Sequence, residues 1–227
     1  MKKLPLLFCC LVFLCGCFSA HSLSKKGFTD KLEAKNLMAN GLKEGKWIEY
    51  PYIVKVSTPP HEHHRYRYHT YPVQHSIDSS YRLTIYHNGI PTGTVRDFYP
   101  DGVLRQISYY SNGKYNGVCK SYYRSGKIQV VSPCTNGKGN GVTKVYYESG
   151  RLQAETPFTD GVCNGVAKSY YENGNLWSEN PITNGSTNGV LKEYYENGKL
   201  KRETPYTNGK KGIAKNYNGN GNEITVK

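Results

Sequence analysis

The chain has 227 residues and is basic, with 30 Lys and Arg against 17 Asp and Glu and a formal net charge of +13. Hydrophobic residues make up 37% of the chain. The 24 glycines and 21 tyrosines indicate a chain rich in turns and aromatic residues but of low overall hydrophobicity. The charge bears on solubility and on acidic partners but does not determine a fold. Because much of the chain repeats itself, its length does not convert into a count of globular domains.

The first residues have the features of an export signal. Lys2 and Lys3 precede an apolar stretch over residues 4–14. This stretch is too short to span a bilayer and is typical of a signal peptide. We therefore expect residues 1–16 to be removed from the mature protein.

The end of this segment, Leu-Cys-Gly-Cys, resembles the bacterial lipobox, and its last residue is Cys17. The resemblance implies a lipoprotein signal peptide, lipidation of Cys17 and a membrane-anchored protein of the cell envelope. Phe18 follows in place of the aspartate associated with inner-membrane retention, which implies an outer-membrane location. Ordinary cleavage after Ala20, giving a periplasmic or secreted protein, is the alternative.

Residues 17–40 are expected to be an N-terminal tether, and residues 41–80 a partial repeat, "GLKEGKWIEY", followed by an insert rich in His and Tyr. The insert contains weak candidates for metal ligands, His61, His63 and His64. Clustered imidazoles suit zinc, copper or nickel. Their spacing fits no closed tetrahedral site, however, and neighbouring arginines oppose a cation. We expect a solvated loop with no dedicated metal site, and we expect no cofactor.

Residues 81–227 are organised by a repeat of 24 residues. Five near-identical segments, such as "GVAKSYYENGNL", begin at Gly93, Gly117, Gly141, Gly165 and Gly189. A sixth, truncated copy begins at Gly212. A fixed period of this size is the signature of a repeat architecture in which each unit contacts mainly its neighbours.

Each repeat, numbered from its first glycine, has two turn signals. Asn-Gly, Ser-Gly or Asp-Gly occupies positions 9 and 10 and predicts a two-residue type I′ turn, and a similar pair recurs at positions 20 and 21. A two-residue first turn makes position 7 face position 12, and position 4 face position 15. It places Glu196 opposite Lys199. It also places Lys144, Lys168 and Lys192 opposite Glu155, Glu179 and Glu203.

Two turns per repeat predict an all-β fold, an extended antiparallel sheet of tandem β-hairpins that is twisted and open, with no helix after residue 80. Alternation along the strands places positions 7, 12 and 18 on one apolar, aromatic face and the Lys/Glu pairs with the position-6 aromatics on the other. A single-layer sheet cannot bury both faces, so the aromatic face becomes the candidate binding surface. Its candidate residues are Tyr99, Tyr123, Tyr147, Tyr171, Tyr195, Phe158 and Tyr206.

The pattern YYENGKLKxExPYxNGKxxG resembles the bacterial variant of the MORN repeat (membrane occupation and recognition nexus), found in YwqK-family antitoxin proteins. The resemblance covers residues 81–227 and implies an array of antiparallel hairpins with a role in protein or membrane association. With no histidine after His87 and the repeated glutamates committed to lysines, we expect no enzyme activity.

The expected function is that of a lipid-anchored binding or scaffold module with an unknown protein partner. An antitoxin or immunity protein that neutralises a toxic partner is the first alternative, and attachment to envelope polymers or anionic lipid surfaces is the second. Export argues against nucleic acid, and self-association is possible. We expect no intramolecular disulfide among Cys119, Cys134 and Cys163, unless a bulge brings Cys119 and Cys134 together.

Overall fold

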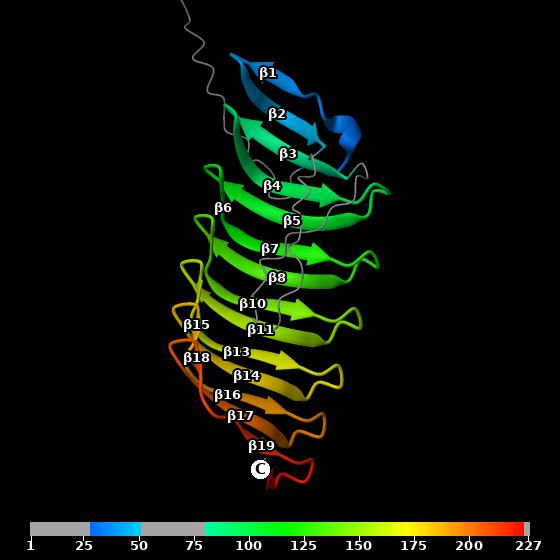
Figure 1. The fold of residues 1–227 in the computed structure, drawn as a ribbon. Helices are drawn as coiled ribbons and strands as arrows, with labels where there is room; N and C mark the ends of the chain where they lie inside the picture. Colours follow the sequence, from blue (N-terminus) through cyan, green and yellow to red (C-terminus); the bar gives the residue numbers. More distant parts are fainter. Residues whose placement is uncertain (1–27, 51–79, 225–227) are drawn as a thin grey trace, which may run out of the picture.

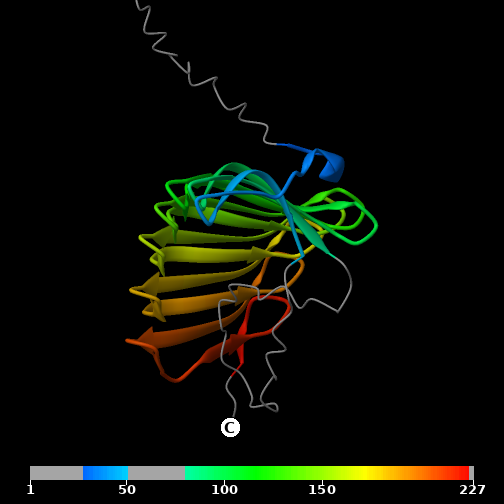
Figure 2. The ribbon, with the colours of Figure 1, turned by 90° about the horizontal axis from the view of Figure 1, so that it is seen from above.

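The computed structural model describes residues 28–50 and 80–224. Apart from one short 3₁₀ turn, Lys31–Glu33, the regular elements of this part are strands, which confirms the predicted all-β class. They form one open antiparallel sheet of 20 strands. Figure 1 shows the strands stacked in chain order, and Figure 2 shows that the sheet is twisted, as predicted.

Each repeat supplies two long strands and one short strand. The first long strands are β4 (Ile90–Phe98), β7 (Gly117–Tyr122), β10 (Gly141–Tyr146), β13 (Gly165–Tyr170) and β16 (Gly189–Tyr194). The second are β5 (Leu104–Ser111), β8 (Ile128–Thr135), β11 (Leu152–Thr159), β14 (Leu176–Thr183) and β17 (Leu200–Thr207). The short strands, which fold back on the second long strand, are β6 (Lys114–Tyr115), β9 (Lys138–Gly139), β12 (Val162–Cys163), β15 (Ser186–Thr187) and β18 (Lys210–Lys211).

Further strands extend the array at both ends. At the N-terminal end, β1 (Leu37–Ala39) and β2 (Leu42–Glu49) form a hairpin, and β2 pairs with β3 (Tyr81–His87), which pairs with β4. At the C-terminal end, β19 (Lys215–Tyr217) pairs with β17 and with β20 (Glu223–Ile224). The sheet therefore continues on both sides of the five repeats.

The hairpin at positions 20 and 21 has the turn that the sequence predicts. Asn112 and Gly113 both have positive φ, 50° and 73°, as a two-residue type I′ turn requires. The equivalent glycine of the second repeat also bonds to the preceding repeat, because the N–H of Gly137 donates to the carbonyl of Tyr115 at 2.8 Å. This turn therefore reverses the chain and also joins neighbouring repeats.

The turn at positions 9 and 10 was predicted incorrectly. In the third repeat the N–H of Gly150 donates to the carbonyl of Tyr147, and the N–H of Tyr147 donates to the carbonyl of Arg151, both at 2.8 Å. Three residues thus lie between Tyr147 and Arg151, and only the glycine has positive φ, 91°. Ser-Gly suits this longer turn because its serine needs no left-handed conformation. In the fifth repeat the residue that faces Lys199 is accordingly Tyr195, not Glu196.

A β-bulge next to this turn restores the predicted register. Tyr146 faces Leu152 while Val145 faces Ala154, so Gln153 is an extra residue in the second strand. The inserted residue offsets the shift caused by the longer turn. The predicted Lys/Glu pairs at positions 4 and 15 are confirmed: Lys144 faces Glu155, Lys168 faces Glu179 and Lys192 faces Glu203.

The bulge also corrects the predicted division of the faces. Position 12 lies opposite position 6 and not opposite position 7, as in the pair Tyr146 and Leu152. At the N-terminal end the equivalent residues, Phe98 and Leu104, pack in one cluster with Leu83 and Phe28. The leucines at position 12 therefore belong with the position-6 aromatics, and they do not extend a face formed by positions 7 and 18.

The glycine that begins the third, fourth and fifth repeats is required by a close approach to a proline. Gly165 has φ of 121°, and a Cβ at this residue would lie 2.9 Å from Cγ of Pro157. A side chain would therefore be strained by its backbone and would overlap the proline ring. The recurring Gly at position 1 and Pro at position 17 are two halves of one contact.

Candidate binding surface

The tyrosines at position 7 connect each repeat to the next. The hydroxyl of Tyr147 donates to the backbone carbonyl of Tyr170 at 2.7 Å. Tyr123, Tyr171 and Tyr195 make the equivalent bonds to Tyr146, Tyr194 and Tyr217 at 2.6, 2.7 and 2.8 Å. Each side chain is half-buried. Their predicted role in binding a partner remains a prediction, and the structure gives them a role in joining repeats.

Tyr99 and the position-18 residues lie in other surroundings. The ring of Tyr99 stacks under the guanidinium of Arg124 at 4.6 Å. Phe158 packs at the opposite end of the strands, against a buried cluster of Cys163, Ala167 and Ile182. Tyr206 faces Gly189 and Lys211 in the last hairpin. The predicted residues of positions 7 and 18 are thus separated along the strands and do not gather into one patch.

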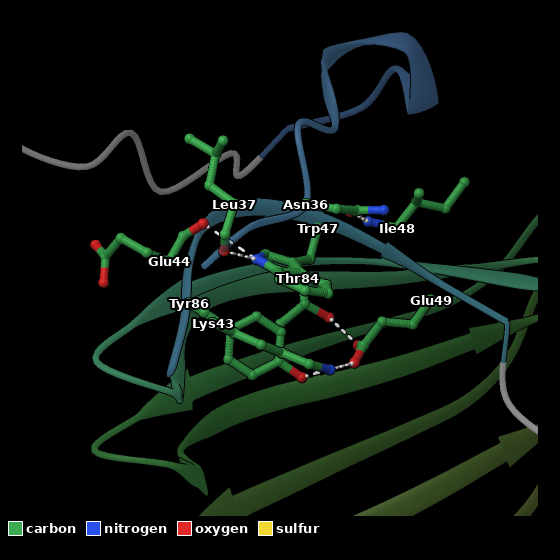
Figure 3. A network of polar contacts seen from close by, with 9 residues as sticks. All are labelled: Asn36, Leu37, Lys43, Glu44, Trp47, Ile48, Glu49, Thr84 and Tyr86. Carbon is green, nitrogen blue, oxygen red and sulfur yellow. Dashed lines mark hydrogen bonds and ion pairs between the residues drawn. The ribbon is translucent and has the colours of Figure 1, made fainter. Parts of the chain in front are cut away.

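A network of polar contacts connects β1, β2 and β3 at the N-terminal end of the sheet (Figure 3). The indole Nε1 of Trp47 donates to the carbonyls of Leu37 and Glu44, both at 3.1 Å, and the N–H of Ile48 donates to Oδ1 of Asn36 at 2.9 Å. On the adjacent strand the hydroxyl of Tyr86 donates to Glu49 at 3.0 Å. Two of these bonds satisfy backbone groups of β2, the N–H of Ile48 and the carbonyl of Glu44, near the end of the sheet, where unpaired groups allow another strand to add.

The opposite charges predicted for positions 4 and 15 form one continuous cross-strand row, which we call the lysine row. Pairing within repeats and between them places its residues directly opposite one another on successive strands. In order they are Arg96, Ile107, Lys120, Val131, Lys144, Glu155, Lys168, Glu179, Lys192, Glu203 and Lys215. Each of the three glutamates therefore lies between two lysines.

The tyrosines at position 6 complete the surroundings of these glutamates. The hydroxyl of Tyr170 donates to Glu155 at 3.2 Å, that of Tyr194 to Glu179 at 3.0 Å and that of Tyr217 to Glu203 at 2.9 Å. Lys144 and Lys168 lie 3.2 and 3.5 Å from Glu155 and Glu179. We call this set of two lysines and one tyrosine hydroxyl a carboxylate cradle. From Lys144 to Lys215 the row is therefore a line of alternating charges with a tyrosine hydroxyl at every carboxylate.

The Tyr194 hydroxyl predicts a loss of stability at alkaline pH. Burial, together with the hydrogen bond to Glu179, raises the pKa of Tyr194 to about 12. A raised folded-state pKa contributes stability that is complete below the unfolded value, about 10, and is lost as the pH rises through the folded value. We expect urea unfolding midpoints to fall from about pH 10 to about pH 12, and to fall less in Tyr194→Phe, which has no hydroxyl to ionise. Parallel falls in the two proteins would contradict this assignment.

The cysteines of the repeats are free thiols. Cys119 lies opposite Ser132, as the register predicts, and Gly117 lies opposite Cys134. Burial, and next to it the neighbouring Cys134, raises the pKa of the Cys119 thiol. Cys163 is buried, and burial raises its pKa too. The thiols of Cys119 and Cys163 are thus held in their protonated, less reactive form.

Other predicted residues lie outside the described residues: the lipidation candidate Cys17 and the metal-ligand candidates His61, His63 and His64. Over residues 28–50 and 80–224, no cluster of three His, Cys, Asp or Glu side chains could hold a metal ion. In the same ranges, no helix has the length and hydropathy needed to cross a membrane.

Sequence reasoning missed two features of this surface. It did not find the carboxylate cradles, because their second lysine and their tyrosine come from the following repeat, whose register was not worked out. It also did not single out the valines at position 2, which are exposed beside the lysine row. Val118, Val142, Val166 and Val190 are 39, 42, 47 and 43% exposed. Their recurrence every 24 residues was the available signal.

Comparison with known families agrees with this geometry. The sequence profile described as the MORN repeat variant matches five segments, residues 91–112, 115–133, 140–160, 164–184 and 187–208. Each segment covers parts of two successive long strands and the turn between them. No curated protein matches the chain. Residues 91–208 thus contain five matches to the MORN repeat variant family.

Proposed function

We propose that this protein is a non-enzymatic binding or scaffold module whose array of repeats presents a long surface to a protein partner. The observation that carries the proposal is the lysine row, in which the same kinds of side chain recur on successive repeats along one line. A repeat array of this kind offers an extended binding surface. Glu155 and Glu179 each already have a lysine and a tyrosine hydroxyl as partners, which favours a structural role for them over acid–base chemistry.

We further propose that the module is anchored in the cell envelope through lipid on Cys17, in the outer membrane where the host has one. The support is the lipobox-like sequence before Cys17. Neutralisation of a toxic partner, the role named for YwqK-family proteins, is a second form of the same binding function. Attachment to envelope polymers or anionic lipid is a third.

The test is capture by the full chain in its native host, with wild type and Cys17→Ser compared. Labelled fatty acid is expected in the wild type only, and equal labelling would remove the anchor. One stoichiometric protein in the wild-type eluate supports a scaffold or an antitoxin. Retention by peptidoglycan or lipopolysaccharide alone would favour attachment and contradict the protein-binding function.

A further inference from the structure

The lysine row changes character along the array. In its C-terminal half Glu155, Glu179 and Glu203 occupy the carboxylate cradles. In its N-terminal half the equivalent positions hold aliphatic residues, Ile107 and Val131. The cations nevertheless continue without interruption through this half, so the charge balance of the C-terminal half is lost there.

The other parts of the cradle are present at both aliphatic positions. Ile107 lies between Arg96 and Lys120, and Val131 lies between Lys120 and Lys144. The position-6 tyrosines that correspond to Tyr170 and Tyr194 are Tyr122 and Tyr146. In the part of the chain that the structure describes, neither hydroxyl donates to a carboxylate. Two cradles thus have their cations and their phenol but lack the acid.

The cations of the N-terminal half are partly buried in the sheet surface. Lys120 and Arg96 are half-buried, and burial lowers the pKa of Arg96. Arg96 also donates to the backbone carbonyl of Phe28 at 3.3 Å. Along the row, Lys120 faces only Ile107 and Val131. A carboxylate added beside this half-buried cation would attract it more strongly than it would a fully exposed cation, because water screens the half-buried charge less.

We propose that the N-terminal half of the lysine row binds an acidic, extended segment of a partner protein, whose carboxylates enter the two cradles at Ile107 and Val131. The proposal rests on the proposed binding function and names the chemistry of its partner. The template for each contact is within the molecule, in the way Tyr170 and Lys144 hold Glu155 while Lys168 faces it from the next strand.

The spacing of the cradles defines the ligand further. Two strands separate one cradle from the next, which is about 10 Å in a sheet. A peptide in the extended polyproline II conformation advances by about 9 Å over three residues and returns every third side chain to the same side, so carboxylates at every third residue match the cradles. The exposed Val118 and Val142 lie beside them and offer apolar contact to the residues between. The cations lie along one line and are half-buried in the sheet surface. This arrangement fits a narrow peptide chain better than a flat anionic lipid surface.

The test measures binding of a fluorescein-labelled peptide with glutamate at every third residue to the full chain, by fluorescence anisotropy. Binding is expected to weaken with added salt and to be lost when glutamine replaces glutamate. Lys120→Gln is expected to weaken it about five- to tenfold, and Lys120→Arg to preserve it. The matched control Lys168→Gln removes the same charge between two occupied cradles and should change affinity less than about twofold.

A second variant places a carboxylate of the protein itself in one cradle. Val131→Glu makes the second repeat resemble the third and is expected to weaken peptide binding, because its own carboxylate takes Lys120, Lys144 and the Tyr146 hydroxyl. Thr207→Glu adds the same charge at the end of β17 and serves as its control. Thermal unfolding of each variant separates loss of binding from loss of fold.

Several outcomes would overturn the proposal: no binding of the peptide to the wild type, equal losses in Lys120→Gln and Lys168→Gln, or binding to phosphatidylglycerol vesicles without binding to the peptide. If the peptide fails to bind while host capture still returns a stoichiometric protein, this inference fails and the proposed function stands. If the peptide binds as expected and capture returns no protein, the proposed function fails instead.

Discussion

Replacement of Tyr147 by alanine is expected to destabilise the array by about 2 to 3 kcal/mol, less than a fully buried aromatic loses. The side chain is half-buried between successive repeats, and its hydroxyl donates to the carbonyl of Tyr170 at 2.7 Å. The substitution therefore removes packing and a hydrogen bond at one interface between repeats. Because stability in an array is a sum of units and interfaces, the loss should appear as easier opening of this interface in hydrogen exchange and as a lower urea midpoint.

The neighbouring tyrosine provides a matched control. Tyr147→Phe removes only the hydroxyl and is expected to cost about 1 kcal/mol. Tyr146→Phe removes a hydroxyl that has no hydrogen-bond partner among the described residues and should be nearly neutral. Equal costs for the two would show that the bond between repeats contributes nothing. Tyr147→Phe also tests the predicted binding role of Tyr147, because its ring remains available to a partner.

The sequence was sufficient for the parts of the fold that depend on local chemistry. Asn-Gly at Asn112 and Gly113 admits few turns, and the period of the glycines defines the repeat. The charge pattern then fixed the pairing of Lys144 with Glu155, since a slip of one residue would have separated every pair.

The parts that could not be predicted depend on geometry between residues. Ser149-Gly150 is compatible with both a two-residue and a three-residue turn, and the bulge at Gln153 hides the difference from the charge pattern. The contacts of Tyr147 and Tyr170 with neighbouring repeats depend on the twist of the sheet, which no single repeat encodes. The sequence therefore identified the aromatic residues of the candidate surface but not how they are arranged in space.

The ion pair between β3 and β4, whose carboxylate is buried, carries the largest expected effect of any charged group. Asp97 is 2% exposed and accepts two hydrogen bonds from Arg82, at 2.7 and 3.1 Å. Asp97→Asn keeps the shape but leaves the guanidinium of Arg82 without its opposite charge. We expect a loss of about 2 to 4 kcal/mol, somewhat less than for a fully buried pair broken from one side, because the Arg82 side chain is 33% exposed and is partly hydrated.

A second ion pair, which joins the first repeat to the second, has the same length but lies in solvent. Arg124 is 2.7 Å from Asp101, and the two side chains are 61 and 48% exposed. Asp101→Asn should cost less than about 1 kcal/mol, because water and salt screen the exposed pair, and its amide oxygen can still accept the Val103 N–H. Both variants can be compared by urea unfolding at low and high salt, where only the smaller effect should shrink further. If the two substitutions cost the same, burial does not control the strength of these pairs, and Asp97 would be no more than another surface acid.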